Sequence, residues 1–233
     1  MRKPNLFSSL ASKAAFNAGA HLRPVIEKEI LHYDILFVLQ REKFLADLTF
    51  QGGTLLRLCH GSNRYSEDLD FMGGEGFEPA RLLRMKECLE DYVTARYDLP
   101  VSLKTPAETK AELINDGIRV DKWQLSIQTA PERRDLPQQR IKLEVCNLSA
   151  VTRENVAVKI NYDGLPDGYG DMIVPAETLN EVLADKVVSL SACEKYIRHR
   201  DIWDLRFLQQ KGATIDPALV EDKVRGYRVD DFQ

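Results

Sequence analysis

The sequence predicts an α+β fold, in which a mixed or antiparallel sheet is flanked by helices and followed by a helical unit at the C-terminus. Helical and strand patterns alternate through the first hundred residues, and four strand-like segments then follow one another. Beyond Pro175 the apolar spacing is helical almost to the end of the chain. We therefore expect an N-terminal extension over 1–21, a sheet domain over 22–174 and a C-terminal helical unit over 175–233.

Glycine and proline signals delimit the elements of the first half. Pro24 stands where a helix begins, and apolar residues at helical spacing follow it. Gly52-Gly53 ends one short strand, and Gly73-Gly74 ends a second strand in which polar and apolar residues alternate. The expected helices are 6–20, 25–46, a short helix from Thr54, and 79–97, and the expected strands are 47–50 and 68–71.

The second half divides into strands and then helices. Alternating polar and apolar residues predict the strands, and a 3.6-residue spacing predicts the helices. The expected strands are 100–104, 117–129, 140–147 and 156–161, and the expected helices are 176–195, 199–210 and 217–226.

Composition excludes several classes of protein. The net charge of −4 gives no global positive field, so a nucleic-acid partner would need a local basic patch. We find no signal peptide and no run near the ~20 apolar residues that span a bilayer, so we expect a cytoplasmic protein without a membrane partner. The cysteines are widely spaced and form no CxxC pair, which argues against a structural zinc site or a disulfide framework and predicts buried free thiols. They are Cys59, Cys88, Cys146 and Cys193.

Two carboxylates in the second expected strand predict a metal site. Asp68 and Asp70 are two residues apart, so their side chains lie on the same face of a strand. Two neighbouring anions repel each other unless a cation lies between them. Mg²⁺ is the natural cation, because it prefers oxygen ligands and is usually held by one or two carboxylates together with substrate phosphates. The alternative is a solvated pair of surface acids.

The glycine pair ahead of these acids predicts a phosphate site. Without side chains, Gly52 and Gly53 let backbone N–H groups approach a phosphate, and the N-terminus of the following helix favours an anion. Thr54 could donate its hydroxyl to the same phosphate. The alternative for the glycine pair alone is an ordinary turn. A phosphate site just before a metal pair is what phosphoryl or nucleotidyl transfer requires.

Gly52-Gly53-Thr54, with Arg57 and then residues 64–71, resembles the AbiEii/AbiGii toxin family of minimal nucleotidyltransferases, in the DNA polymerase β-like nucleotidyltransferase superfamily. The similarity extends from about Glu29 to about Leu208. It implies a polymerase β-like nucleotidyltransferase domain over 22–174 and a magnesium-dependent enzyme that transfers NMP from an NTP. It also implies the toxin of a bacterial toxin–antitoxin or phage-defence (abortive infection) system, with a cognate antitoxin encoded nearby. The acceptor would be a hydroxyl of an RNA, such as a tRNA, or a hydroxyl of a protein.

The resemblance gives roles to residues later in the chain. Glu144 shares a strand face with Lys142. It matches the third carboxylate of the superfamily, which completes the metal site or acts as the base. Many members of the superfamily have Asp at this position. Lys186 resembles the family's triphosphate-binding lysine, and one of Asp201 and Asp204, one helical turn apart, would orient Lys186 or the nucleotide. The expected catalytic and metal-binding residues are Asp68, Asp70 and Glu144. The expected nucleotide-binding residues are Gly52, Gly53, Thr54, Arg57, Lys142, Lys186, Asp201 and Asp204.

Structural alternatives stay open for several of these positions. Glu144 could belong to a solvated strand face, and Asp201 could be an acid that favours a helix N-terminus. A basic run could contact RNA phosphates or be a solvated face; it consists of Lys195, Arg198, His199 and Arg200. The alternative function is a non-catalytic nucleotide-binding module that senses NTP and regulates a partner. The complete carboxylate set argues against a sensor, which has no need of metal ligands.

Overall fold

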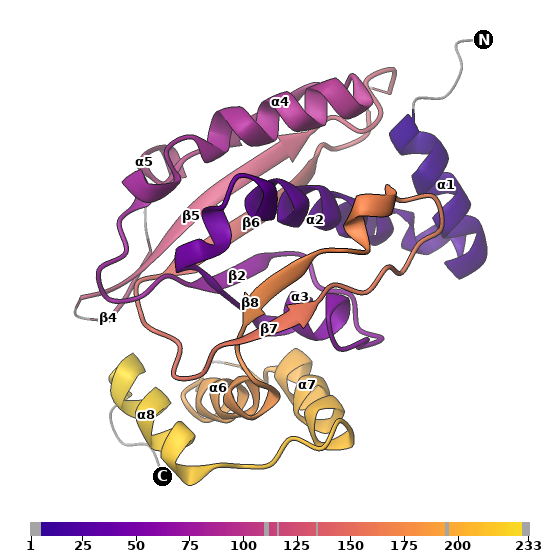
Figure 1. Cartoon of the computed structure of the whole chain (residues 1–233). Coiled ribbons are helices and arrows are strands. Elements are labelled where there is room, and N and C mark those ends of the chain that lie inside the picture. The colour runs from indigo at the N-terminus through magenta and orange to yellow at the C-terminus, as the bar shows by residue number, and fades with distance from the viewer. Residues whose placement is uncertain (1–5, 110–111, 116, 134, 194–195, 230–233) are drawn as a thin grey trace.

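A mixed sheet of eight strands forms the centre of the molecule (Figure 1). The computed structural model describes residues 6–109, 112–115, 117–133, 135–193 and 196–229. The strands pair in the order β3-β5-β6-β2-β1-β8-β7, and β4 pairs with β5. Their bounds are β1 Thr49–Gln51, β2 Leu69–Met72, β3 Val101–Lys104, β4 Glu112–Asn115, β5 Ile118–Ile127, β6 Gln139–Cys146, β7 Glu154–Ala157 and β8 Ile173–Ala176. The pairs β2–β6 and β1–β8 are parallel and the rest are antiparallel, so the expected mixed sheet is confirmed.

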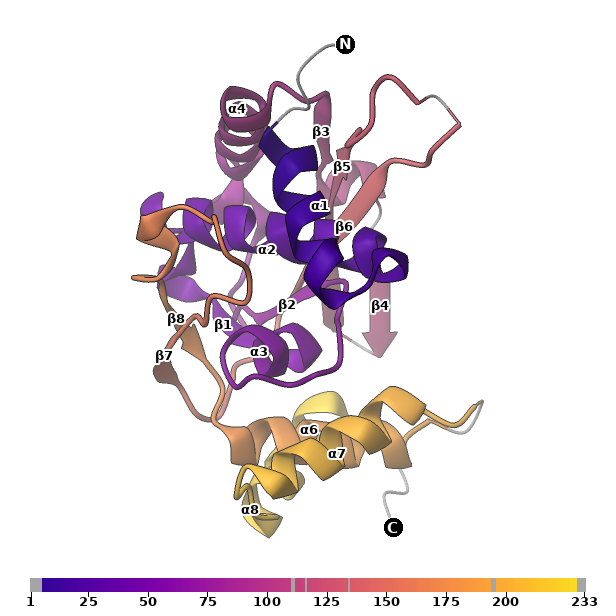
Figure 2. The same cartoon turned by 90° about the vertical axis from the view of Figure 1, so that its right-hand side faces the viewer.

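The helices form two groups, one around the sheet and one beyond it. Around the sheet lie α1 Leu6–Ala18, α2 Arg23–Arg41, α3 Gly52–Leu58, α4 Met85–Tyr97 and α5 Pro106–Thr109. The C-terminal helices are α6 Leu179–Ser191, α7 His199–Gln210 and α8 Pro217–Tyr227. In both views these three form a layer of their own below the sheet (Figures 1 and 2). The expected helical unit at the C-terminus is therefore present, and no described helix is long and apolar enough to cross a membrane.

The N-terminal helix belongs to the main core. Phe7 and Ala11 of α1 are fully buried and lie in the same hydrophobic cluster as Phe50 and Phe71 of the central strands. Helix α2, against which α1 packs, is buried on almost every side. Residues 6–18 therefore pack onto the core of the sheet domain.

Local backbone geometry moves several expected boundaries. The helix expected over 25–46 ends at Arg41, because Lys43 adopts a left-handed conformation with φ of 63°, and a 3₁₀ turn follows over Phe44–Asp47. The helix expected over 79–97 is a 3₁₀ turn, Pro79–Leu82, followed by α4. The short elements α5 and β4 were not predicted.

Pro175 lies inside a strand, not at the start of a helix as predicted. β8 pairs with β7, and its Ala176 pairs with Phe50 of β1. Helix α6 begins only at Leu179, where the Thr178 side chain caps it by accepting from the Glu181 N–H. The sheet therefore continues into the helical layer through two residues, which places α6 close to the central strands.

A buried lysine attaches α8 to α6. The Nζ of Lys223, which is 4% exposed, lies 3.1 Å from Glu177, 2.6 Å from Glu181 and 3.0 Å from Asp185. Among the described residues these acids are the one group whose ligand atoms all lie within 4.8 Å of one another, and the lysine ammonium supplies their counter-charge. Burial, followed by the charge of Asp185, raises the pKa of Glu177 well above its usual range, so a proton on Glu177 further reduces the negative charge. The end of the chain is thus held by ionic contacts.

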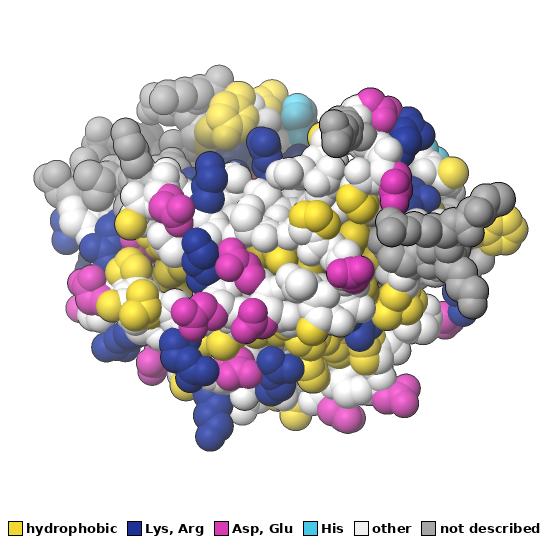
Figure 3. Space-filling model, turned by 90° about the horizontal axis from the view of Figure 1, so that it is seen from above, with side chains coloured by type: hydrophobic (Ala, Val, Ile, Leu, Met, Phe, Trp, Pro, Cys, Tyr) yellow, Lys and Arg dark blue, Asp and Glu magenta, His cyan; other side chains and the backbone are white. Residues whose placement is uncertain are grey.

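The surface and the cysteines fit the composition. On the side of the molecule that carries α4, basic, acidic and hydrophobic side chains are interspersed (Figure 3). All four cysteines are free, as predicted. Cys59 and Cys146 are buried, whereas Cys88 and Cys193 are only half-buried, so the expectation of burial was wrong for these two.

Candidate active site

The pairing of β2 with β6 gathers three carboxylates at the centre of the sheet. Asp70 of β2 is the direct neighbour of Glu144 on β6, and Gln51 flanks it on β1. Asp68 lies two residues before Asp70, so its side chain emerges on the same face. Neighbouring strands are only ~4.8 Å apart, so the register places the acids close together. The sequence predicted the individual acids, but not that β6 lies beside β2.

These carboxylates fit a hard divalent cation. Burial, followed by the negative charges of Glu144 and Asp68, raises the pKa of Asp70 to about 7, and a cation bound there would lower it again. All three donors are carboxylate oxygens, the ligands that Mg²⁺ prefers. Lys142, half-exposed on β6, has its Nζ 4.0 Å from both Asp68 and Glu144, and Lys122 lies 3.4 Å from Glu144. The acids thus have flanking cations, which the sequence alone did not show.

Gly52 is required at the turn between β1 and α3. Its φ of 78° is left-handed, and a Cβ at this position would lie 2.8 Å from Asp70 Oδ2. The turn therefore brings the backbone against the Asp70 carboxylate. Helix α3 has only seven residues, so the dipole at its N-terminus is small.

Thr54 and Arg57 lie in structural positions instead of lining the cleft. Thr54 is 1% exposed and its hydroxyl donates to the Asp68 carbonyl, which uses the proton that was expected to bind a phosphate. Arg57 donates to Glu29 at 2.8 Å and to the Ser62 carbonyl at 2.9 Å. Arg57 follows Gly52 by five residues, about 140° around a helix, so it points away from the acids. In place of phosphates, these residues hold the start of β2 and attach α3 to α2.

A cluster of buried ion pairs fixes the cations of the cleft. Lys186 Nζ lies 2.8 Å from Asp201 and 3.1 Å from Asp204, so both acids orient it, where one was expected. Arg64 donates two bonds to Asp204, at 2.8 and 2.7 Å, and Arg198 pairs with Asp201. Asp201 also lies in the first turn of α7, so the alternative that it is an acid favouring a helix N-terminus is met as well. No role was predicted for Arg64 from the sequence, because its partner Asp204 lies 140 residues further along the chain.

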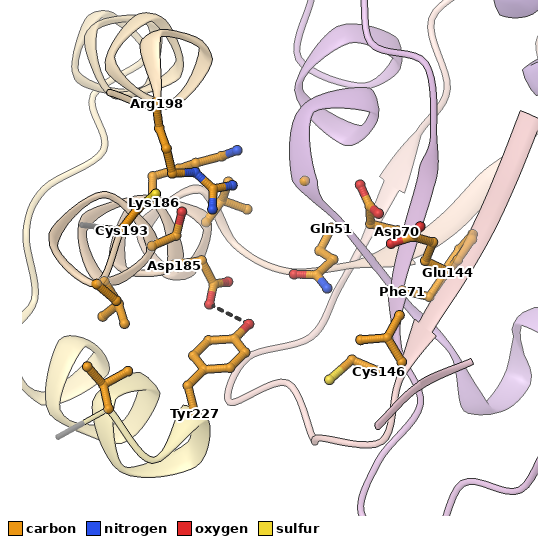
Figure 4. A pocket seen from close by; sticks show the side chains of 17 residues that line it. Gln51, Asp70, Phe71, Glu144, Cys146, Asp185, Lys186, Cys193, Arg198 and Tyr227 are labelled. Atoms are coloured by element: carbon orange, nitrogen blue, oxygen red, sulfur yellow. Dashed lines mark hydrogen bonds between the residues drawn. The ribbon is translucent and has the colours of Figure 1, made fainter. Parts of the chain in front are cut away.

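Two cavities meet at Asp70 and Lys186. The first, about 680 Å³, lies between the sheet and helices α6 and α8 and is lined mainly by apolar side chains (Figure 4). The second, about 540 Å³, is polar and extends from Gly53 to the start of α7. The second cavity is lined by Asp68 and Arg64 and by three residues of the basic run. These three are Arg198, His199 and Arg200. The fourth residue of that run, Lys195, lies outside the described residues.

Comparison with known proteins identifies the family. A family model described as "Nucleotidyl transferase AbiEii toxin, Type IV TA system" matches residues 34–233. The chain belongs to the AbiEii family. The predicted family and the predicted enzyme class, a nucleotidyltransferase, are thereby confirmed. Membership of a toxin family implies an NTP substrate and a cognate antitoxin.

A solved structure resembles this AbiEii protein in fold. JHP933 from Helicobacter pylori is 21% identical, with a TM-score of 0.50, over 88% of this chain and 79% of that one. A second H. pylori protein, named as a candidate nucleotidyltransferase, is 19% identical with a TM-score of 0.47, over 87% of this chain and 83% of that one. No curated protein matches the chain. At this identity the likeness to JHP933 concerns the fold alone.

Substitution of Gly53 should weaken nucleotide binding by displacing Arg64. A Cβ at Gly53 would lie 2.3 Å from Arg64 Nη2 and 3.0 Å from Ser66 Oγ. The end of a flexible side chain can move, so we expect Gly53→Ala to fold while NTP affinity falls by roughly tenfold, the loss of about one charged hydrogen bond. Titration with NTP and Mg²⁺ measures this. Gly76→Ala is the control, because a Cβ there meets nothing within 4 Å. Equal affinity for parent and Gly53→Ala would show that the position of Arg64 does not affect nucleotide binding.

Proposed function

We propose that this AbiEii protein is a magnesium-dependent enzyme that transfers NMP from an NTP to a hydroxyl of an RNA. The observation that carries the proposal is the meeting of three carboxylates with Lys186 at the junction of the two cavities. Anionic groups on one side and cations on the other suit a reaction between a metal–triphosphate and a hydroxyl. The antitoxin and a cytoplasmic location stay predictions.

Asp68, Asp70 and Glu144 would hold the magnesium. When bound, the metal would supply a Lewis acid that stabilises the charge on the reacting phosphate oxygens. Lys186 and Arg64 would bind the β- and γ-phosphates, and the buried Asp204 holds both cations before substrate arrives. The hydroxyl oxygen attacks the α-phosphorus, the bond to the β-phosphate oxygen breaks, and pyrophosphate leaves.

Two roles are open for Glu144. It is 22% exposed at the cleft, so its carboxylate could take the proton of the attacking hydroxyl as well as complete the metal site. The Nζ atoms of Lys122 and Lys142 lie 3.4 and 4.0 Å from the Glu144 carboxylate, so two cations flank it.

RNA is the acceptor that the polar cavity favours. The cavity is lined by Arg198, His199 and Arg200, and also by Tyr196, which is 65% exposed. Arginines bind phosphates, and an exposed aromatic ring can stack on an unpaired base. Single-stranded RNA combines both features, whereas a protein hydroxyl has neither.

Label transfer tests the proposal. The protein is incubated with each α-³²P-labelled NTP, Mg²⁺ and total RNA, with total protein as the second acceptor. We expect label on RNA, none with EDTA, and none on protein. Label on protein would refute the RNA acceptor, and NTP binding without transfer to either acceptor would favour the sensor.

Lys186→Ala should weaken NTP affinity by roughly ten- to a hundredfold, since a hydrogen bond to a charged group contributes about 1.5–3 kcal/mol. Lys186 is 14% exposed and lines both cavities, so its ammonium faces the cleft. Titration with NTP and Mg²⁺ measures the change. Lys211→Ala, at the far end of α7, is the control and should bind normally. If parent and Lys186→Ala bind equally well, the helical layer does not contribute to the triphosphate site.

A further inference from the structure

Helix α7 has an outer face that the rest of the described chain leaves uncovered. Figure 2 shows α7 in front of α6, at the outer side of the helical layer, with no described element in front of it. The buried residues of the helix lie at helical spacing on the inner side; they are Asp201, Asp204 and Leu208. On the outer face Trp203 is 51% exposed. Tryptophan is enriched where proteins bind partners, so this ring marks a candidate binding surface.

Positively charged side chains flank this ring. His199 and Arg200 precede Trp203 by four and three residues, and Arg206 follows it by three, so all of them lie beside the ring on the helix surface. The three flanking side chains are exposed. Neither Arg200 nor Arg206 forms an ion pair with a described residue. The outer face of α7 thus carries an aromatic ring between two arginines whose charges are not neutralised.

The acids of α7 do not offset these cations. Asp201 and Asp204 are buried, and Lys186 Nζ lies 2.8 Å from the first and 3.1 Å from the second. Arg64 and Arg198 add further positive charge to the same pair. The outer face is therefore cationic, although the whole chain has a net charge of −4. A single-stranded nucleic acid fits this surface, because it combines a polyanionic backbone with flat rings that stack on aromatic side chains.

This outer face is continuous with the transfer site. His199 and Arg200 line the polar cavity together with Asp70 and Lys186. A helix rises ~1.5 Å per residue, so Arg206 lies ~10 Å further along α7 than His199, about the length of three stacked nucleotides. An RNA whose reacting hydroxyl lies at the carboxylates can therefore extend along α7 with its neighbouring nucleotides.

We propose that the outer face of α7 binds the unpaired 3′ end of an RNA, with one base stacked on Trp203 and with phosphates bound by Arg200 and Arg206. This inference rests on the proposed function, because it takes RNA as the acceptor. Bases inside a duplex stack on one another and offer no free face to an aromatic side chain. The surface thus selects an acceptor with unpaired nucleotides next to its terminal hydroxyl.

Two fluorescein-labelled RNA hairpins test this selection, one with a short unpaired 3′ end and one with a blunt end. Affinity is measured by fluorescence anisotropy with Mg²⁺ and without NTP. The wild type should prefer the unpaired end by roughly five- to a hundredfold, and Trp203→Ala should abolish the preference. Trp203→Phe keeps a ring and should retain most of it. Phe16→Ala removes an 89% exposed ring from α1, apart from the helical layer, and is the control that should bind as the wild type does (Figure 1).

The phosphate contacts have a separate readout. Arg206→Gln should weaken binding of the unpaired end and reduce the slope of log affinity against log salt concentration by about 0.7, the value for one phosphate contact to a single strand. An unchanged slope and affinity would remove Arg206 from the surface.

Tryptophan fluorescence shows whether RNA contacts the ring itself. The chain has two tryptophans, and Trp123 is only 2% exposed, so quenching by acrylamide reports mainly on Trp203. The hairpin with the unpaired end should protect Trp203 from acrylamide, and the blunt hairpin should protect it less. If the face binds a protein instead, neither RNA will change the quenching, and the inference is overturned.

Binding and transfer can fail independently. Binding of the unpaired end that depends on Trp203, without label transfer to RNA, would refute the transfer reaction and support the surface. Transfer to RNA, with equal affinity of wild type and Trp203→Ala for the unpaired end, would leave the function standing and overturn the surface. A wild type that binds both hairpins equally well would also overturn it.

Discussion

Asp70→Asn should reduce NMP transfer by about a thousandfold or more, while the protein stays folded. Asp70 lies between Asp68 and Glu144, and an amide of the same shape loses the charge that a metal ligand needs. Loss of several kcal/mol of metal stabilisation in the transition state corresponds to this factor. Transfer of label from α-³²P-NTP measures it, with Asp91→Asn on the surface of α4 as the control.

The same variant should be at least as stable as the parent when Mg²⁺ is absent. The pKa of Asp70 is raised to about 7, so the folded protein binds this proton more tightly than the unfolded chain does. The stability that comes from the proton is complete below about pH 4 and is lost as the pH rises toward 7. Asp70→Asn does not undergo this loss, so its advantage in melting temperature should be larger at pH 8 than at pH 5. A destabilised variant, or one with undiminished transfer, would contradict the assignment of Asp70.

Lys223→Met should lower the free energy of unfolding by about 3–5 kcal/mol at pH 8, as expected when one partner of a buried ionic network is removed. Three acids contact this ammonium, and the methionine leaves them without a counter-charge. Urea unfolding measures the change, and Lys211→Met at the exposed end of α7 is the control. A loss below about 1 kcal/mol would show that packing alone attaches α8 to α6.

Local patterns predicted the elements that carry the chemistry, and long-range contacts explain most of what they missed. The alternation at Asp68 and Asp70 and the glycines before them concern neighbouring residues, so the strand and the turn could be predicted. Glu144 joins them only through the β2–β6 register, and a resemblance, not a pattern, pointed to it.

The remaining differences have specific causes. Pro175 suggested a helix start, but a strand tolerates proline where its N–H is not needed, and β8 was missed for this reason. Arg57 was assigned to the nucleotide because it stands in the motif, whereas its angle on α3 directs it to Glu29. The part played by Arg64 depends on Asp204, which no local pattern connects to it.

The position of the radioactive label tests the central claim most directly. The protein is incubated with RNA and Mg²⁺, and the NTP carries ³²P at either the α- or the γ-phosphate. Nucleotidyl transfer predicts that α-label appears on RNA and γ-label appears in pyrophosphate. Asp70→Asn should show neither. Appearance of γ-label on RNA would mean phosphoryl transfer, and it would contradict the account of this site given above.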